Sequence, residues 1–434
     1  MFFSRRLISL VTASLLFFKC AGLSSAENSA SPACVRLSLE PLFAIARDLE
    51  QQNLLDGEIL VAFQDQVILH LTSRNLASQN NQFMIGSVSK QFFAVALLRT
   101  LYDQSLGNTE EEKIEKVRTK LHLPLSQYIP ENSSLWYGSM PSWANMVTLH
   151  HLLTHTSGIV DYTSSDEFSA HMTNGKRFAE LPHSPAEIIG LIINKELLFS
   201  PGSRASYSNT GYFLIAEVIK SITQQPLDEY LQKTLFIPLG LTRTYHVAEG
   251  NWYNLKRDRR FLLLAPERYY DPTNREQNVY PPNSFIDMSV AQGAGSIIST
   301  ANDLLIWNLA MHRTEVLLPK KLYELMITTD LDEYGYGIGI ENSKQGAVLG
   351  HIGVIDSYQT LLCYLPEQEL SIIMLSNIAV DETKINLEFM NIYTSIENQD
   401  NQARFEEALK ILEERYPPYR GLKKVLEILR LTLF

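Results

Sequence analysis

A serine and a lysine lie three residues apart in the segment Gly86-Ser87-Val88-Ser89-Lys90, at the start of a predicted helix. Residues with this spacing lie one turn apart on the same face of a helix. Serine is a weak nucleophile until a neighbouring group takes its proton, and a lysine amine can help when its pKa is lowered. The dipole of a helix N-terminus also favours a developing oxyanion. Ser87 and Lys90 therefore indicate nucleophilic catalysis, although a helix N-terminus with a solvated lysine shows the same pattern.

Two later segments could complete such a site. Tyr207-Ser208-Asn209 lies in a loop that leads into a predicted helix, and Gly350-His351-Ile352-Gly353 lies at the end of a predicted strand. Glycine in such a strand lets a ligand approach the backbone closely. Each side chain also has a structural interpretation: Tyr207 as a packed aromatic, Asn209 as a helix cap and His351 as a structural histidine.

Ser-x-x-Lys, Tyr-x-Asn and His-x-Gly, in this order, resemble the motifs of the penicillin-recognising serine hydrolases. The branch concerned contains class C β-lactamases, D-alanyl-D-alanine carboxypeptidases and related esterases. The resemblance extends from about residue 37 to residue 393 and includes the segments 152–159, 238–241 and 293–296. It implies a β-lactamase/transpeptidase-like fold and catalysis through an acyl-enzyme, without a metal or an organic cofactor.

The resemblance implies a role for each member of a catalytic group. Ser87 would be the acylated nucleophile, and Lys90 would hydrogen-bond to it and help to hold it deprotonated. Tyr207 would act as general base for acylation and as acid for the leaving group. The nearby ammonium group would lower the pKa of Tyr207 for this purpose.

The resemblance also implies a substrate-binding group. Asn209 would orient the substrate amide, and His351 and Gly353 would line the pocket on an edge strand. The backbone N–H groups of Ser87 and Val354 would form the oxyanion hole.

The chain departs from the family pattern at His351-Ile352-Gly353, where many relatives have Lys-Thr-Gly. A lysine supplies a permanent cation for a substrate carboxylate, whereas a histidine with an ordinary pKa of about 6.5 is mostly neutral at pH 7. The threonine hydroxyl that could bind the same carboxylate is also missing. We therefore expect a small-molecule or peptide substrate with an ester or amide bond. D-Amino-acid peptides of the cell wall are natural candidates, β-lactam turnover is less favoured, and the bulk of Val354 would narrow the acyl pocket.

Two other functions can be considered. A non-catalytic binding or sensing module would keep the fold without turnover, but all three residues of the catalytic group are present. A metal site could use His150, His151 and His155, of which the last two are four residues apart. No glutamate follows His151 in the His-Glu-x-x-His manner and no third ligand is evident, so we expect no metal.

Strands are predicted at both ends of the chain and helices between them. The predicted strands are 57–63, 67–71, 82–85, 334–340, 348–352, 358–364 and 370–375, and the predicted helices include 37–49 and 88–102. The stretch from about 103 to 307 is mostly helix and loop. This order predicts an α+β fold: one antiparallel sheet, flanked by helices and assembled from both termini, with an inserted, mostly helical lobe at roughly 103–307.

The composition is that of an ordinary globular protein, with 434 residues, 45% hydrophobic and 20% charged. The 48 acidic and 37 basic residues give a formal net charge of −11. Nucleic-acid binding requires clustered Lys and Arg, so no nucleic-acid partner is expected. The basic cluster at 256–260 is interpreted as a solvated loop.

The first 26 residues have the pattern of a secretory signal peptide. Arg5 and Arg6 precede an apolar stretch at 7–18, and small residues follow at Ser24-Ser25-Ala26. The apolar stretch is too short to span a bilayer as a mature helix. We therefore expect an exported protein, periplasmic or secreted, without stable membrane insertion after cleavage. An uncleaved N-terminal anchor is the alternative.

The remaining chain divides into a hydrolase domain at 27–401 and a C-terminal helical extension at 402–434. Apolar residues recur at helical spacing in two parts of the extension, which either packs on the body or contacts a partner. Cys34 and Cys363 would remain after cleavage. They could form a disulfide in an exported compartment or stay as buried free thiols, the latter being favoured.

Overall fold

The computed structural model describes residues 57–73, 76, 81–170, 177–248, 267–271, 276–280, 286–343 and 346–380. Several sequence predictions lie outside these ranges: the signal peptide at 1–26, Cys34, the helix at 37–49, the basic cluster at 256–260 and the extension at 402–434. None of the helices in the described ranges is long and apolar enough to cross a bilayer.

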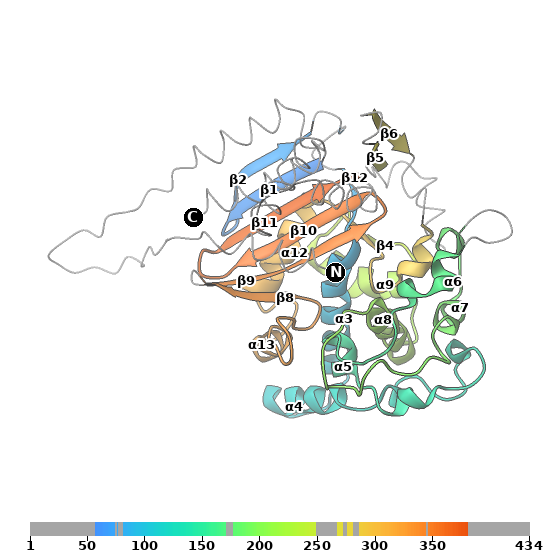
Figure 1. Cartoon of the computed structure of the whole chain (residues 1–434). Coiled ribbons are helices and arrows are strands. Elements are labelled where there is room, and N and C mark those ends of the chain that lie inside the picture. Colours follow the sequence, from blue (N-terminus) through green and yellow to red (C-terminus); the bar gives the residue numbers. More distant parts are fainter. Residues whose placement is uncertain are drawn as a thin grey trace, which may run out of the picture.

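A six-stranded antiparallel sheet built from distant parts of the chain lies at the centre of the fold (Figure 1). Its strand order is β2-β1-β11-β10-β9-β8, so the N-terminal hairpin lies directly beside the C-terminal strands. Leu60 pairs with Ile373, and Leu361 pairs with Met374. The predicted α+β architecture, with an antiparallel sheet assembled from both ends of the chain, is therefore confirmed. The strands are β1 (Gly57–Phe63), β2 (Gln66–Thr72), β8 (Gly339–Ser343), β9 (Gly346–Ile355), β10 (Tyr358–Leu365) and β11 (Leu370–Ser376).

Helix α12 (Ala301–Arg313) packs on the sheet against β1, β10 and β11. It begins after Thr300, whose side chain accepts a hydrogen bond from the backbone N–H of Asp303, as expected for a helix N-cap. Its Trp307 stacks on Phe92 of helix α3 (Ser89–Asp103), with ring centroids 3.8 Å apart. The sheet is thereby joined through α12 to the helix that contains Lys90.

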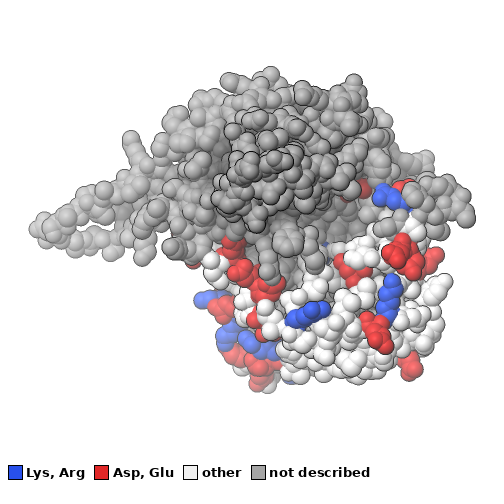
Figure 2. Space-filling view, viewed as in Figure 1, with Lys and Arg blue, Asp and Glu red and all other residues white. Residues whose placement is uncertain are grey.

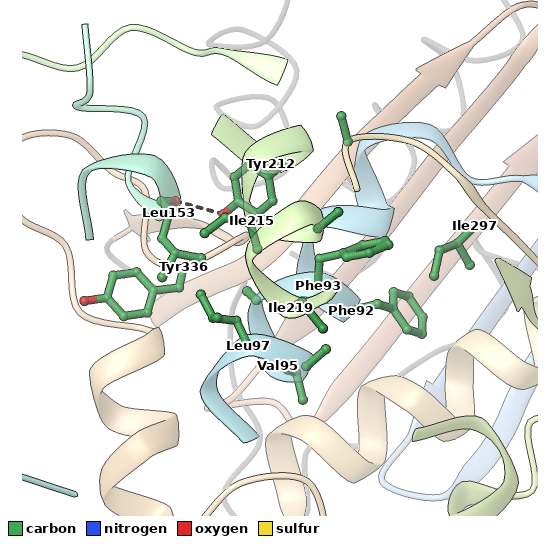
Figure 3. Close-up of a cluster of buried hydrophobic side chains, with 14 of the residues drawn as sticks. Phe92, Phe93, Val95, Leu97, Leu153, Tyr212, Ile215, Ile219, Ile297 and Tyr336 are labelled. Carbon is green, nitrogen blue, oxygen red and sulfur yellow. Dashed lines mark hydrogen bonds between the residues drawn. The ribbon is translucent and has the colours of Figure 1, made fainter. Parts of the chain in front are cut away.

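Helix α3 is the centre of the helical layer, and every residue from Ser89 to Leu98 is buried. A helix that is apolar around most of its circumference is stable only when it is enclosed. Helix α8 (Asn209–Thr223) packs beside it, and Figure 3 shows Phe93 and Leu97 in one apolar cluster with Ile215 of α8. The predicted helix at 88–102 is confirmed, and its packing fixes the position of the Ser-x-x-Lys segment.

Between β3 (Phe83–Met84) and β8 the described part of the chain forms helices, 3-10 turns and most strands of two small sheets, which β3 and the later strand β12 complete. The strand orders of these sheets are β3-β7-β4 and β12-β5-β6, and the sequence did not predict β4 to β7. Strands of two to five residues are too short to show a clear periodicity. The further helices are α4 (Glu110–Leu121), α5 (Leu149–Leu153), α6 (Asp166–Ser169), α7 (Pro185–Gly190), α9 (Leu227–Leu231), α10 (Ile237–Leu239) and α13 (Lys320–Met326); the further strands are β4 (Tyr245–His246), β5 (Glu267–Asp271), β6 (Glu276–Tyr280), β7 (Ile297–Ser299) and β12 (Ile378–Val380).

The strand predicted at 334–340 is displaced along the chain. Strand β8 begins at Gly339, and Tyr334 forms only an isolated bridge with that residue. Gly337 has a φ of 72°, and a Cβ atom there would lie 2.6 Å from the carbonyl oxygen of Lys90. The alternating tyrosines and glycines resemble a strand pattern, but the glycines instead form a turn packed closely against α3.

Cys363 lies on β10 as a buried free thiol. Burial raises the pKa of this thiol to about 12, so it is protonated at neutral pH and is a poor nucleophile. The nucleophile of a catalytic site in the described ranges must therefore be sought elsewhere.

Charged side chains of both signs are interspersed on the described surface seen in Figure 2. Lys321 pairs with Glu111 at 2.6 Å, and Arg99 pairs with Asp103 at 3.1 Å. On this face of the described surface, the basic residues are therefore not gathered into a continuous patch.

Candidate active site

The structure brings together the three residues of the predicted catalytic group. Lys90 Nζ donates a hydrogen bond to Ser87 Oγ at 3.0 Å, and Tyr207 Oη donates to the same oxygen at 2.7 Å. Two donors on one hydroxyl oxygen hold its lone pairs in fixed directions and stabilise negative charge on it. Ser87 therefore has the surroundings that an activated serine needs.

Ser87 lies in a tight junction between a 3-10 turn, η1 (Gly86–Val88), and strand β9. Gly86 has a φ of 50°, and a Cβ atom there would lie 2.7 Å from the backbone nitrogen of Val354. A Cβ atom on Gly353 would lie 1.9 Å from the Ile85 carbonyl oxygen and 3.1 Å from the backbone nitrogen of Ser87. Only glycine at both positions permits this approach, which brings the backbone nitrogens of Ser87 and Val354 to the same junction.

Strand β9 is not the edge strand that the sequence analysis expected. Strand β8 lies outside it, but their pairing ends at Gly339 and Gly350. Beyond that point β9 pairs with β10 alone, as in the Gly353–Thr360 pair. The expectation of an edge strand was wrong for β9 as a whole, because β8 covers its first half. It was right for the second half of β9, which contains His351 and Gly353 and has β10 as its one neighbouring strand.

Lys90 is completely buried and donates three hydrogen bonds. Besides Ser87, its acceptors are Asn209 Oδ1 at 2.9 Å and the Ala294 carbonyl oxygen at 2.8 Å. Burial lowers the pKa of Lys90 to about 7, while the negative charge of Asp161 raises it in part. At neutral pH a large fraction of Lys90 is therefore uncharged and able to accept a proton.

Tyr207 differs from the sequence prediction in its ionisation. The nearby ammonium group was expected to lower the pKa of Tyr207, and this expectation is wrong. Burial raises this pKa well above its ordinary value; the hydrogen bond to Ser87 lowers it less, and the charge of Asp161 raises it further. The phenol is therefore protonated at neutral pH, so it is placed to donate a proton rather than to accept one.

Asn209 is the first residue of α8 rather than its cap, since Ser208 occupies the cap position. Its backbone N–H and its Nδ2 both donate to Asp161 Oδ2, each at 3.1 Å. Its Oδ1 accepts from Lys90. Asp161 was missed by the sequence analysis, although it lies two residues after the recognised segment 152–159.

His351 has both ring nitrogens engaged by the protein. Nδ1 lies 2.6 Å from the Ile352 carbonyl oxygen, and Nε2 lies 2.9 Å from the Tyr334 hydroxyl. A carbonyl oxygen only accepts, so the network assigns the proton to Nδ1, and Nε2 accepts from Tyr334. Burial and the charge of Lys90 lower the pKa of His351 to about 3. The imidazole is therefore neutral at pH 7, in agreement with the sequence prediction.

Aromatic rings to which the sequence analysis gave no catalytic role enclose this group. His155 lies 4.2 Å from the Tyr207 ring and 4.7 Å from the Tyr334 ring, measured between centroids. Its Nδ1 accepts from the Ser208 backbone N–H at 3.1 Å, which holds the loop before α8. Tyr334 comes from the turn that precedes β8 and was taken for part of a strand, so no local signal connected it with the site.

The histidines weighed as metal ligands do not converge. His150 Nδ1 lies 2.9 Å from the Tyr336 hydroxyl, and His151 Nδ1 accepts from the Thr148 backbone N–H at 3.2 Å. His155 instead faces Tyr207. Among the described residues, no group of three or more His, Cys, Asp or Glu is arranged to hold a metal ion.

A family model described as Beta-lactamase matches residues 44–392, which include every predicted site residue. The chain belongs to the beta-lactamase family. Its curated relatives in this family include a penicillin-binding protein of Bacillus subtilis (strain 168), 24% identical over 369 residues, or 79% of this chain and 72% of the relative. A protein of Escherichia coli (strain K12), provisionally named a D-alanyl-D-alanine carboxypeptidase, is 22% identical over 321 residues, or 67% of this chain and 72% of the relative.

Solved structures support the same beta-lactamase-family fold. The D-amino acid amidase of Ochrobactrum anthropi SV3, in complex with D-phenylalanine, superposes with a TM-score of 0.61 at 17% identity. The match covers 89% of this chain and 99% of the amidase. At this identity the likeness shows the fold alone. The beta-lactamase family is one of serine hydrolases, and the type of reaction must be argued from the site.

Proposed function

We propose that this chain is an exported serine hydrolase that cleaves ester or amide bonds through an acyl-enzyme on Ser87. The observation that carries the proposal is that Ser87 Oγ accepts hydrogen bonds from Lys90 and Tyr207 at 3.0 and 2.7 Å. Export rests on the sequence pattern of residues 1–26.

Acylation begins with the neutral form of Lys90, whose two N–H groups serve Asn209 and Ala294 and whose lone pair faces Ser87 Oγ. This lone pair accepts the Ser87 proton as Oγ attacks the substrate carbonyl. The backbone N–H groups of Ser87 and Val354 stabilise the oxyanion at the junction of η1 and β9. Tyr207 then gives its proton to the leaving alcohol or amine. The phenolate that remains is stabilised by Lys90, whose Nζ lies 4.9 Å from the centre of the Tyr207 ring.

Deacylation reverses these proton movements. Water attacks the acyl carbonyl and gives a proton to the Tyr207 phenolate. The Ser87 oxygen leaves and takes back its proton from the Lys90 ammonium, which restores the starting protonation states. The net reaction adds one water molecule to the ester or amide bond.

The substrate class follows from the environment of His351. This residue is neutral at pH 7, and both of its nitrogens are engaged, so it offers no cation to a substrate carboxylate. Esters or amides without an essential carboxylate therefore fit best. D-Alanyl peptides are also candidates, because relatives in the family are named as D-alanyl-D-alanine carboxypeptidases. The solved amidase relative was captured with a free D-amino acid, D-phenylalanine.

The proposal is tested by offering the purified chain three acyl donors: p-nitrophenyl acetate, an N-acylated D-Ala-D-Ala peptide and benzylpenicillin. We expect turnover of the ester, and the relative rates on the other two distinguish an esterase from a carboxypeptidase or a β-lactamase. A chain that turns over none of them and forms no covalent product with any would be a non-catalytic binding module.

The side chain of Val354 is expected to limit the size of the acyl group. Val354 follows Gly353 in the half of β9 that β8 does not cover. Its side chain lies beside the nucleophile, and the residue is 54% exposed to solvent. Replacement of Val354 by glycine should therefore raise kcat/KM for p-nitrophenyl butyrate relative to the acetate, by about tenfold. Using the ratio of two esters cancels any general loss from a looser strand.

Val316→Gly is the matched control, because Val316 is 51% exposed and lies outside the site. It should leave the butyrate-to-acetate ratio unchanged. A Val354→Gly ratio equal to that of this control would show that Val354 does not border the acyl pocket.

A further inference from the structure

Asp161 connects the start of a 3-10 turn to the first residue of α8. Its Oδ1 accepts from the backbone N–H of Thr163 at 3.0 Å and from Thr163 Oγ1 at 2.9 Å. Its Oδ2 accepts from the backbone N–H and the Nδ2 of Asn209, both at 3.1 Å. All four bonds are donated to the carboxylate, which fixes its position firmly.

This arrangement determines which way the Asn209 amide faces. A carboxylate can only accept, so Asn209 must turn its Nδ2 toward Asp161. Its Oδ1 then points in the opposite direction and accepts from Lys90 Nζ at 2.9 Å. Asp161 thus acts on Lys90 through one intervening amide, without touching Ser87 itself.

The carboxylate is also the charge that opposes the burial of Lys90. The titratable groups that face Lys90 are Asp161, the phenols of Tyr207 and Tyr212, and the imidazoles of His155 and His351. Burial raises the pKa of both phenols and lowers the pKa of both imidazoles, so all four are neutral near pH 7. Among these described neighbours, Asp161 alone contributes a negative charge, and it favours the ammonium form of Lys90.

We propose that Asp161 is a positioning residue that orients Asn209 toward Lys90 and sets the pH range in which Lys90 accepts the Ser87 proton. This inference rests on the proposed function, because it concerns the same proton transfer. It adds a residue that lies outside the three recognised motifs and contacts none of the reacting atoms.

The test is the pH dependence of kcat/KM for p-nitrophenyl acetate. This substrate is neutral, so the fall of the rate at low pH, the acid limb of the profile, reports the pKa of a group in the free enzyme. In the unchanged chain we expect the rate to fall below about pH 7, as Lys90 becomes protonated. Replacement of Asp161 by asparagine removes the charge that favours the ammonium form. The acid limb should therefore move to lower pH by about one unit. The plateau should fall because asparagine has one acceptor oxygen where aspartate has two, so either Thr163 or Asn209 loses its acceptor.

Three further variants separate the effect of the negative charge of Asp161 from the effect of its hydrogen bonds. Asp161→Ser also lacks the charge but keeps an acceptor oxygen, so it should show the same shift of the acid limb, even if Asp161→Asn folds poorly. Thr163→Val removes the two hydrogen bonds of Thr163 Oγ1, with Asp161 and with Asn209, and keeps the charge, so it should lower the plateau without moving the limb. Asp166→Asn removes an exposed carboxylate of the neighbouring helix α6 and should change neither.

The outcomes are distinct. Ser87-dependent hydrolysis with an unmoved acid limb in both neutral Asp161 variants would overturn the inference and leave the proposed function in place. A shift of equal size in Asp166→Asn would also overturn it, because a distant charge would then be sufficient. Hydrolysis that does not depend on Ser87 would overturn both.

Discussion

Replacement of Ser87 by alanine is expected to lower kcat/KM for p-nitrophenyl acetate by at least about 10⁴-fold. The substitution removes the oxygen on which Lys90 and Tyr207 converge, and no other described group accepts both hydrogen bonds. The backbone fold should persist, because the 3-10 turn is held by backbone contacts with β9 rather than by the hydroxyl. Initial rates over a wide range of enzyme concentration measure the loss.

Ser89 provides a matched control within the same five-residue segment. Its buried Oγ accepts from the backbone N–H of Ile297 at 3.0 Å. Ser89→Ala should lower the free energy of unfolding by about 1–2 kcal/mol, because that N–H loses its acceptor, while turnover remains. Equal loss of activity in Ser87→Ala and Ser89→Ala would indicate a disturbed helix rather than a lost nucleophile.

Replacement of Lys90 by methionine should lower kcat/KM by roughly 10²- to 10⁴-fold. Methionine has a similar length and suits a completely buried position, but it cannot accept the Ser87 proton. Below about pH 7 the unchanged chain should lose activity about tenfold per pH unit, since burial lowers the pKa of Lys90 to about 7 and protonation removes the base. The residual activity of Lys90→Met should lack this acid limb, and pH–rate profiles of both proteins measure the difference.

Lys120→Met is the control for loss of a partly buried lysine. Lys120 donates to Ser105 Oγ at 3.1 Å on another part of the helical layer. The Lys120→Met variant should retain the activity and the acid limb of the unchanged chain. A Lys90→Met protein that is folded and still shows the acid limb would assign that limb to a different group.

Much of this site could be predicted because its catalytic residues lie in short sequence motifs. Ser87 and Lys90 are one helical turn apart, and the apolar residues that follow predict the helix that holds them. The strands at both ends of the chain also predicted an antiparallel sheet assembled from both termini. These features depend on sequence spacing, which is visible without a structure.

The remaining features depend on contacts between distant segments. Asp161 acts on Lys90 through Asn209 only because α8 begins beside it. Tyr334 contacts His351 because Gly335 and Gly337 turn the chain before β8. The ionisation of Tyr207 was predicted in the wrong direction for a similar reason. A neighbouring ammonium was inferred from the motifs, whereas the burial that raises the pKa of Tyr207 is a property of the whole fold.

Covalent labelling can show whether Ser87 is the nucleophile that becomes acylated. The purified chain is treated with a fluorophosphonate, which phosphonylates activated serines, and its intact mass and peptide map are recorded. We expect one adduct, located on Ser87, absent from Ser87→Ala and formed more slowly by Lys90→Met. A chain that stays unlabelled while a known serine hydrolase in the same tube is labelled, or a Ser87→Ala protein that carries the same adduct, would contradict this expectation.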